Sequence, residues 1–113
     1  MNILLLPVEG PVLDATDLVA QALGEQADLV SLPASRLADG FFDLRTGVAG
    51  EYAQKFVNYR VRLAVIGDIS AHTERSEALR AFVAESNRGR QLWFVRTQAD
   101  LDDRLRRESG RPQ

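Results

Sequence analysis

The sequence predicts an α/β domain with about four mainly parallel strands and helices packed on the sheet. Short apolar runs alternate with longer segments whose apolar residues recur at helical spacing. Such an alternation is typical of parallel strands joined by right-handed helical crossovers. At 113 residues the chain is close to the commonest domain size, so we assign residues 1–107 to one domain. We expect residues 108–113 to form a disordered C-terminal tail, because chain ends are commonly disordered.

Composition and charge exclude several classes of protein. Hydrophobic residues make up 45% of the chain and charged residues 27%, which is ordinary for a globular domain. There is no cysteine, so thiolate chemistry is excluded and a cytoplasmic location is expected. A formal net charge of -2 argues against nucleic-acid binding, which needs a basic surface. The apolar residues 1–7 are too short for a membrane span, so we expect no membrane contact.

The first third of the chain contains two expected strands and one helix. Residues 3–8 form a continuous apolar run that ends in a turn at Glu9, so we expect an interior strand with both faces covered. Asp14 follows as the expected N-cap of a helix. Residues 28–32 form a second short strand, which Pro33 ends because proline cannot donate to a ladder.

The rest of the chain continues the alternation after a long irregular connection. Residues 34–46 form that connection, and a connection of this length is usually functional or partly helical. Apolar residues at helical or strand spacing then predict two helices, two strands and a final capped helix. These elements are expected over residues 47–59, 61–67, 76–87 and 91–95, with the final helix beginning at Thr97.

The order of the strands decides which loops lie together. The sequence does not determine this order, but one candidate is the flavodoxin-like order 2-1-3-4, in which the first and third strands are central neighbours. In that order their exit loops diverge and leave a crevice at the carboxyl ends of the strands. The crevice would bring Glu9 and Asp68 together, with the connection that ends at Thr46 beside them.

The residues around Thr46 are the first candidate site. A helix that begins near Gly47 directs unpaired N–H groups toward an anion, and Arg45 can add a bidentate contact. Phosphorylation of Thr46 would place negative charge at the same helix end, where it is electrostatically tolerated. The simpler alternative is that Thr46 only caps the helix, with Gly47 and Gly50 allowing another backbone to pack closely.

Three carboxylates form a second candidate site. Glu9, Asp43 and Asp68 carry the hard oxygen ligands that a magnesium-type cation prefers. Their spacing matches no known metal loop, and Asp68 has a simpler role in closing a turn through nearby amides. No glycine-rich phosphate loop follows the first strand. We therefore predict no metal and no cofactor.

Catalysis by histidine would have to use His72, the only histidine of the chain. Ser70, His72 and Asp68 lie close in sequence, but neighbours along one loop rarely have the geometry of a catalytic triad. The chain also lacks a nucleophile elbow of the G-x-S-x-G type. We assign no catalytic residue, and the sequence favours a non-enzymatic domain.

Two adjacent aromatic residues, Phe41 and Phe42, favour a protein interface. Adjacent side chains outside a helix tend to point apart, so one ring is expected in the core and the other at the surface. An exposed aromatic beside a charged loop is typical of a protein contact, and a homodimer is one such contact. The alternative is that both rings close the loop from inside the core.

Residues 85–88 end the helix that we expect over 76–87. We assign them a structural role, in which buried hydrogen bonds tie this helix end to its neighbour near Asn58 and Tyr59. This end of the sheet lies opposite Thr46, so these residues belong to a different region from the candidate sites.

Several blocks of sequence resemble one bacterial family. The run from Phe41 to Glu51, continued by Gln54-Lys55-Phe56, Asn58-Tyr59 and Gly67-Asp68, resembles the signature of domain of unknown function 4180. Residues 85–89 resemble that family's second block, and the resemblance spans roughly residues 12–100. The layout is also similar to STAS domains of the anti-sigma-factor antagonist type. That similarity implies a STAS-like fold in which Thr46 occupies the place of a phosphorylatable residue.

The sequence therefore leads to two hypotheses. The first is a regulatory or protein-interaction domain that uses residues 41–47 as its contact surface for an unknown protein partner. The second is a small enzyme or a domain that binds a small anionic ligand. Its site would consist of Glu9, Asp43, Arg45, Thr46 and Asp68. Convergence of these residues in one concave pocket would favour the second hypothesis.

Overall fold

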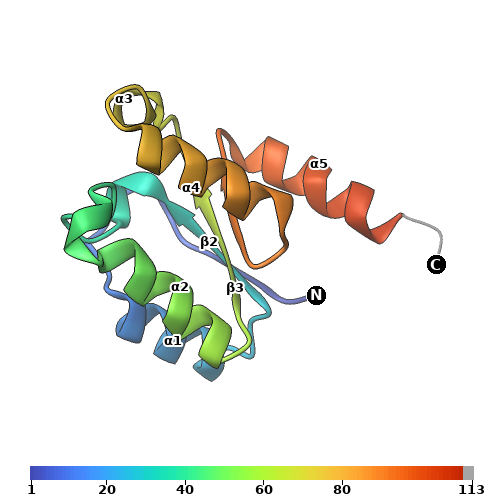
Figure 1. The fold of residues 1–113 in the computed structure, drawn as a ribbon. Helices are drawn as coiled ribbons and strands as arrows, with labels where there is room; N and C mark the ends of the chain where they lie inside the picture. Colours follow the sequence, from blue (N-terminus) through green and yellow to red (C-terminus); the bar gives the residue numbers. More distant parts are fainter. Residues whose placement is uncertain (111–113) are drawn as a thin grey trace.

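A computed structural model describes residues 1–110 and shows one four-stranded sheet (Figure 1). Every neighbouring pair of strands is parallel, and the strands lie in the order β1-β2-β3-β4. Their bounds are Ile3–Leu5 for β1, Leu29–Pro33 for β2, Arg62–Ile66 for β3 and Leu92–Val95 for β4. The predicted α/β class and the expected parallel sheet are confirmed.

Five α-helices and two short 3-10 helices connect or follow the strands. Side-chain caps begin three of the helices: Asp14 and Thr97, both expected as caps, and Ser76 each accept a hydrogen bond from the N–H three residues later. The helices are α1 (Ala15–Gly24), η1 (Ala34–Arg36), η2 (Leu44–Thr46), α2 (Val48–Asn58), α3 (Ser70–Thr73), α4 (Glu77–Arg88) and α5 (Gln98–Ser109). Within residues 1–110, no helix combines the length and the apolar composition needed to cross a bilayer.

The two faces of the sheet are covered unequally. Helices α1, α2 and α4 pack on one face, where Leu4, Val30 and Leu63 lie side by side in register. Helix α5 packs on the other face, where Leu101 contacts the side of the sheet that carries Trp93. In Figure 1, α5 lies on the opposite side of the strands from α1 and α2. Right-handed crossovers that always lead to the next strand place their helices on one face, so only the last helix is free to cover the other.

The sheet does not have the candidate strand order 2-1-3-4, because β2 lies between β1 and β3. The first strand is consequently an edge strand and not an interior one, and it ends at Leu5 instead of Val8. Its outer-face side chains remain accessible, with Ile3 39% and Leu5 58% exposed. A continuous apolar run does not distinguish a central strand from an edge strand, because the covering of its second face depends on a distant helix.

Two buried polar side chains fix the loops that follow β1 and β2. The guanidinium of Arg36, a residue that is 6% exposed, donates to the backbone oxygens of Pro11 (3.0 Å) and Pro7 (3.2 Å). The hydroxyl of Tyr52 donates to the oxygen of Leu13 and accepts from the N–H of Ala38 at 3.0 Å. Burial raises the pKa of the Tyr52 hydroxyl, which therefore stays protonated as a donor.

Asn87 closes the outer edge of β4. Its side-chain oxygen accepts from the N–H of Phe94 at 2.8 Å, and its side-chain nitrogen donates to the oxygen of Phe94 at 3.2 Å. One amide thus occupies both backbone groups that Phe94 would offer to another strand. The structural role expected for residues 85–88 is present, but its partner is β4, and not the end of α2 near Asn58 and Tyr59.

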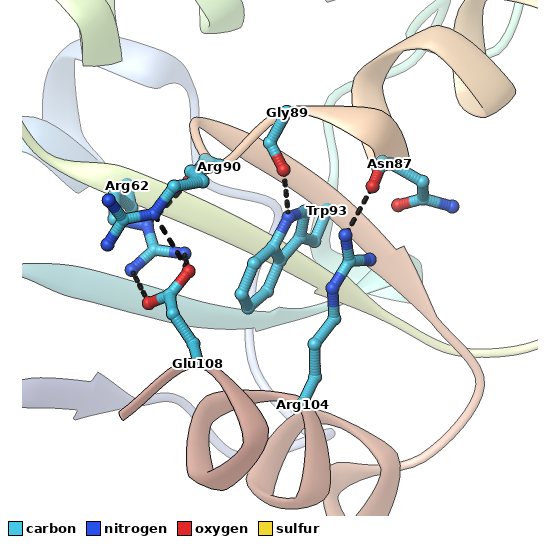
Figure 2. Close-up of polar contacts among 7 residues, drawn as sticks. All are labelled: Arg62, Asn87, Gly89, Arg90, Trp93, Arg104 and Glu108. Atoms are coloured by element: carbon cyan, nitrogen blue, oxygen red, sulfur yellow. Dashed lines mark hydrogen bonds and ion pairs between the residues drawn. The ribbon is translucent and has the colours of Figure 1, made fainter. Parts of the chain in front are cut away.

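Trp93 holds α5 against the sheet (Figure 2). The guanidinium carbons of Arg62 and Arg104 lie 4.5 Å and 4.0 Å from the centroid of its ring, close enough for cation–π attraction. Near the end of the helix, Glu108 pairs with Arg62 at 3.0 Å and with Arg90 at 2.8 Å. These contacts join α5 to the beginning of β3 and to the loop before β4.

The contacts of Glu108 correct part of the expected tail over residues 108–113. Helix α5 continues to Ser109, so Glu108 and Ser109 are helical. No local pattern indicates this extension of the helix, because the partners of Glu108 are distant along the chain. Residues 111–113 of the expected tail lie outside the described residues.

We predict that Glu108→Gln lowers the free energy of unfolding at pH 7 by about 1 kcal/mol, because it removes a partly buried carboxylate from two guanidinium groups. Hydrogen bonds from Arg90 and then Arg62 lower the pKa of Glu108 from its ordinary value of 4.5. Its contribution is therefore present above that value and is lost as pH falls through the folded pKa. Urea unfolding at pH 7 and at pH 3 should show the difference between the proteins shrinking at acid pH.

The matched control for this prediction is Glu85→Gln. Glu85 pairs with Arg88 through side chains that are 75% and 74% exposed, and such surface pairs contribute about 0–1 kcal/mol. A loss in the control as large as that in Glu108→Gln, or a loss that does not change with pH, would contradict the assigned role of Glu108.

Candidate functional site

The carboxyl ends of the strands bear the candidate site. The connection after β3 leads through α3 to α4 on one face of the sheet, and the connection after β4 leads to α5 on the other. Exit loops of neighbouring strands that turn to opposite faces leave a crevice, and ligands of open α/β sheets bind there. The crevice of this sheet therefore lies between β3 and β4, whereas the order 2-1-3-4 would have placed it between the first and third strands.

A cavity of about 330 Å³ occupies this position, which we call the β3–β4 crevice. It is bounded by the loop after β3, the first half of α4 and the end of β4. Its lining combines apolar side chains with three charged ones. The apolar residues are Ile69, Val83, Phe94 and Val95, and the charged residues are Asp68, Arg80 and Arg96.

The charged side chains of the crevice are only partly paired. Arg96 Nη2 lies 3.5 Å from Asp68 Oδ2, a distance beyond that of a short charge-assisted hydrogen bond. Arg80 Nη2 donates to the backbone oxygen of Thr73 at 3.1 Å. With two guanidinium groups and one carboxylate, the lining carries an excess of one positive charge.

Asp68 has the turn-closing role that the sequence offered as its simpler explanation. Asp68 Oδ1 accepts from the N–H of Ser70 at 2.9 Å. Hydrogen bonds from Ser70, followed by the charge of Arg96, lower the pKa of Asp68. The carboxylate is therefore ionised at neutral pH and is held beside the crevice.

Asp43 and Arg45 are paired with each other. Arg45 Nε donates to Asp43 Oδ1 at 3.0 Å, and Arg45 Nη2 donates to Asp43 Oδ2 at 2.9 Å. This bidentate contact lowers the pKa of Asp43 and raises that of Arg45. Arg45 remains 90% exposed, so it is accessible, but an anion has to compete with Asp43 for its guanidinium.

Thr46 closes its own loop. Its hydroxyl oxygen lies 2.7 Å from the oxygen of Gly40 and 2.8 Å from that of Asp43, and it accepts from the N–H of Val48 at 3.2 Å. The single hydroxyl hydrogen is donated to one carbonyl at a time. The N-cap of α2 is Gly47 and not Thr46, but Thr46 accepts from the first residue of that helix, and its hydroxyl is already engaged within the loop.

The expected role of Gly47 and Gly50, which was to allow another backbone to pack closely, is wrong. A side chain at Gly47 or Gly50 would meet nothing within 4 Å, so neither is required for close backbone packing. Gly47 instead has a φ of 80°, a left-handed conformation that joins η2 to α2 and that favours glycine.

The two adjacent phenylalanines pack edge-on against each other, with ring centroids 5.1 Å apart, but they differ in burial. Phe41 is 1% exposed and packs edge-on against Tyr52, with ring centroids 5.2 Å apart. Phe42 is half-buried and stacks on His72, with centroids 4.2 Å apart and an angle of 9° between the rings. Phe42 is therefore the accessible aromatic of the pair, and Phe41 holds the loop to the core.

Two hollows flank the stacked rings of Phe42 and His72. One, of about 400 Å³, is lined by residues of the β2–α2 connection that include Asp39 and Gly40. The other, of about 550 Å³, is lined by Arg45 and by residues that surround the beginning of α4. Both hollows include Asp43 and the two rings, so the surface around residues 41–47 is concave.

The predicted site residues are not brought together as one site. Asp68 lies in the β3–β4 crevice, Asp43 and Arg45 form their own pair, and Glu9 is exposed in the turn after β1. Among residues 1–110, no group of three or more His, Asp or Glu side chains gathers in a way that could hold a metal ion. The ring of His72 contacts Phe42, while Asp68 bonds with Ser70 and Arg96, so the triad considered from sequence is not assembled.

Sequence reasoning missed Arg80 and Arg96. Arg96 follows the last strand directly, as Asp68 follows the strand before it with one glycine between, and this parallel was available in the sequence. Recognising it required knowing that β3 and β4 are neighbours whose exit loops diverge. Arg80 lies in the first turns of α4 and carries no comparable local signal.

Comparisons with known proteins bear on the family and not on the chemistry. Residues 7–105 match the family described as a domain of unknown function (DUF4180), and this range contains the blocks at 41–51 and 85–89. No curated protein and no solved structure matches the chain. The fold-level similarity to STAS domains therefore stays a prediction. The match covers most of the sequence, and the chain belongs to the DUF4180 family.

Proposed function

We propose that this domain is a non-catalytic, regulatory binding domain for a small organic anion, which it binds in the β3–β4 crevice. The observation that carries the proposal is the pair Arg80 and Arg96, which line one cavity at the divergence of two exit loops. Guanidinium groups are the usual partners of carboxylates and phosphates, because they offer several N–H donors in one plane.

The remaining lining favours an organic ligand over an inorganic ion. The side chains of Ile69, Val83 and Phe94 form an apolar wall, which a hydrocarbon portion of the ligand would cover. A volume of about 330 Å³ is at the lower end of the range typical of small-molecule pockets. The chemistry therefore favours a compact molecule with one acidic group and a small apolar part.

Asp68 sets the affinity of this site in the proposal. It pairs loosely with Arg96 in the free domain, at 3.5 Å. An acidic ligand that forms shorter hydrogen bonds with Arg96 replaces this contact. The nearby negative charge of Asp68 repels the ligand and weakens its binding. The ligand thus competes with an internal carboxylate, which is a common way to keep binding reversible.

We predict that Arg96→Ala and Arg80→Ala each weaken binding about tenfold or more, since a hydrogen bond to a charged group contributes about 1.5–3 kcal/mol. Asp68→Asn should strengthen binding, because it frees Arg96 and removes a like charge. The probes are a panel of small aliphatic and aromatic carboxylates and phosphate monoesters. Thermal shift finds the compounds that bind, and calorimetry measures their dissociation constants for each variant.

The control variant is Arg88→Ala, which removes an equally exposed arginine from the far end of α4, where it pairs with Glu85. Binding by this variant should match that of the unmodified domain. The proposal fails if no compound binds at millimolar concentration, or if the compounds that bind are indifferent to Arg80 and Arg96.

A second candidate function is contact with a protein partner through residues 41–47. The observation in its favour is the stack of half-buried Phe42 on exposed His72, placed between two hollows. The loop that carries it is held by Phe41 in the core and by Thr46, so the surface is preformed. A preformed aromatic surface loses little entropy on binding.

We predict that Phe42→Ala and Arg45→Ala each reduce recovery of a specific partner by at least severalfold in pull-down experiments from the host. Val57→Ala, which removes an exposed apolar side chain from α2, is the control. Quantitative mass spectrometry of the captured proteins provides the measurement. Equal recovery with all the variants, at unchanged thermal stability, would exclude this surface as the interface.

A further inference from the structure

The two edges of the sheet differ in their capacity to accept another strand. On the outer edge of β4, the side chain of Asn87 binds both the N–H and the backbone oxygen of Phe94. On the outer edge of β1, no further strand of residues 1–110 is paired, because β1 is the last strand of the sheet. The β1 edge is therefore the freer of the two for pairing.

Two residues of β1 direct their backbone N–H and oxygen groups toward this open edge. The N–H of Leu6 donates to the oxygen of Ser31 at 3.1 Å, and the oxygen of Asn2 accepts from the N–H of Asp28 at 2.7 Å, so both residues face β2. Alternate residues of a strand direct their backbone groups to opposite sides. The N–H and backbone oxygen of Ile3 and Leu5 consequently point away from the sheet.

Side chains along the same edge form an apolar strip. Ile3 and Leu5 lie on the face of the sheet where α5 packs, but α5 contacts β3 and β4 and leaves them 39% and 58% exposed. Val8, in the turn that follows, is 70% exposed, and Met1 is 67% exposed. Unpaired backbone groups beside exposed apolar side chains are a combination that proteins normally cover or interrupt with charges.

We propose that two copies of this chain associate through β1, which pairs antiparallel with β1 of the second copy about a two-fold axis at Leu4. In this register Ile3 of one copy lies opposite Leu5 of the other, and each such pair exchanges two backbone hydrogen bonds. The same two residues supply every donor and acceptor, so the edge is complementary to itself. The two sheets become one continuous sheet.

The blocked edge of β4 explains why a second copy is the occupant and why association stops at two. Head-to-tail pairing of β1 with β4 would lead to an open-ended fibre, but Asn87 occupies the backbone groups of Phe94 that it requires. Pairing of β1 with itself closes the assembly at two copies, because both β1 edges are then paired.

The area available agrees with a small, transient interface. The exposed parts of Met1, Ile3, Leu5 and Val8 amount to on the order of 400 Å² per copy, or about 800 Å² for the pair, which is the size of a weak, transient interface. The dimer should therefore exchange with monomer. The interface is independent of the β3–β4 crevice, because it involves the opposite edge of the sheet.

The first test is the mass of the domain as a function of concentration. Sedimentation velocity and native mass spectrometry should show a monomer that converts to a dimer, and Leu5→Lys should remain monomeric, because lysine on an edge strand opposes pairing. Val57→Lys places the same charge at a position on α2 with similar exposure, 49%, and should dimerise normally. The proposal is overturned if the unmodified domain is monomeric at several hundred micromolar. It is also overturned if Leu5→Lys dimerises at the same concentration as the unmodified domain.

A second test fixes the register and does not depend on weakening the interface. The chain has no cysteine, so single cysteines can be introduced without background. Residues that form a hydrogen-bonded antiparallel pair have Cα atoms about 5.5 Å apart, which allows a disulfide. A mixture of Ile3→Cys and Leu5→Cys proteins should form a mixed disulfide under mild oxidation. Preferential formation of the Ile3→Cys or Leu5→Cys homodimer, or equal cross-linking by Val57→Cys, would contradict the antiparallel register about Leu4.

Discussion

The architecture depends on one constraint, the winding of the sheet in a single direction. Each crossover leads to the next strand, so right-handed connections place α1, α2 and α4 on the same face. The other face is left to α5, which follows the last strand. Both surfaces for which we propose a function result from this asymmetry. The exit loops of β3 and β4 diverge to form a crevice. The side chains of Ile3 and Leu5 in β1, which no helix covers, remain exposed.

The crevice and the open strand lie at opposite edges of the sheet, and this separation has a consequence for assembly. Pairing through β1 would leave both β3–β4 crevices accessible at the outer ends of the joined sheet. A ligand would then bind each copy at a site that the partner does not contact. Coupling between the two sites would have to pass through four strands of each copy, which are packed and hydrogen-bonded throughout.

Local patterns in the sequence predicted those features of the fold that depend on residues close together in the chain. The caps at Asp14 and Thr97 and the helix expected over residues 47–59 depend on neighbours within one or two turns, and all are present. Strand order and the face covered by α5 depend on contacts between distant segments, and no local pattern encodes them. The candidate site shows the same division: Asp68 was found because it follows a strand, whereas Arg80 required the position of α4 above the crevice.

Helix α5 connects the stability of the domain to the proposed binding site. It buries a single residue completely, Leu101, so its attachment relies on Trp93 between two guanidinium groups and on the ion pairs of Glu108. Its first residue, Gln98, accepts a hydrogen bond from Ser31 Oγ at 2.7 Å. Arg96 precedes this helix by two residues, so its position in the crevice depends on attachment at both helix ends. An anion bound by Arg96, as proposed, would favour the attached state of α5, and by linkage it would stabilise the whole domain.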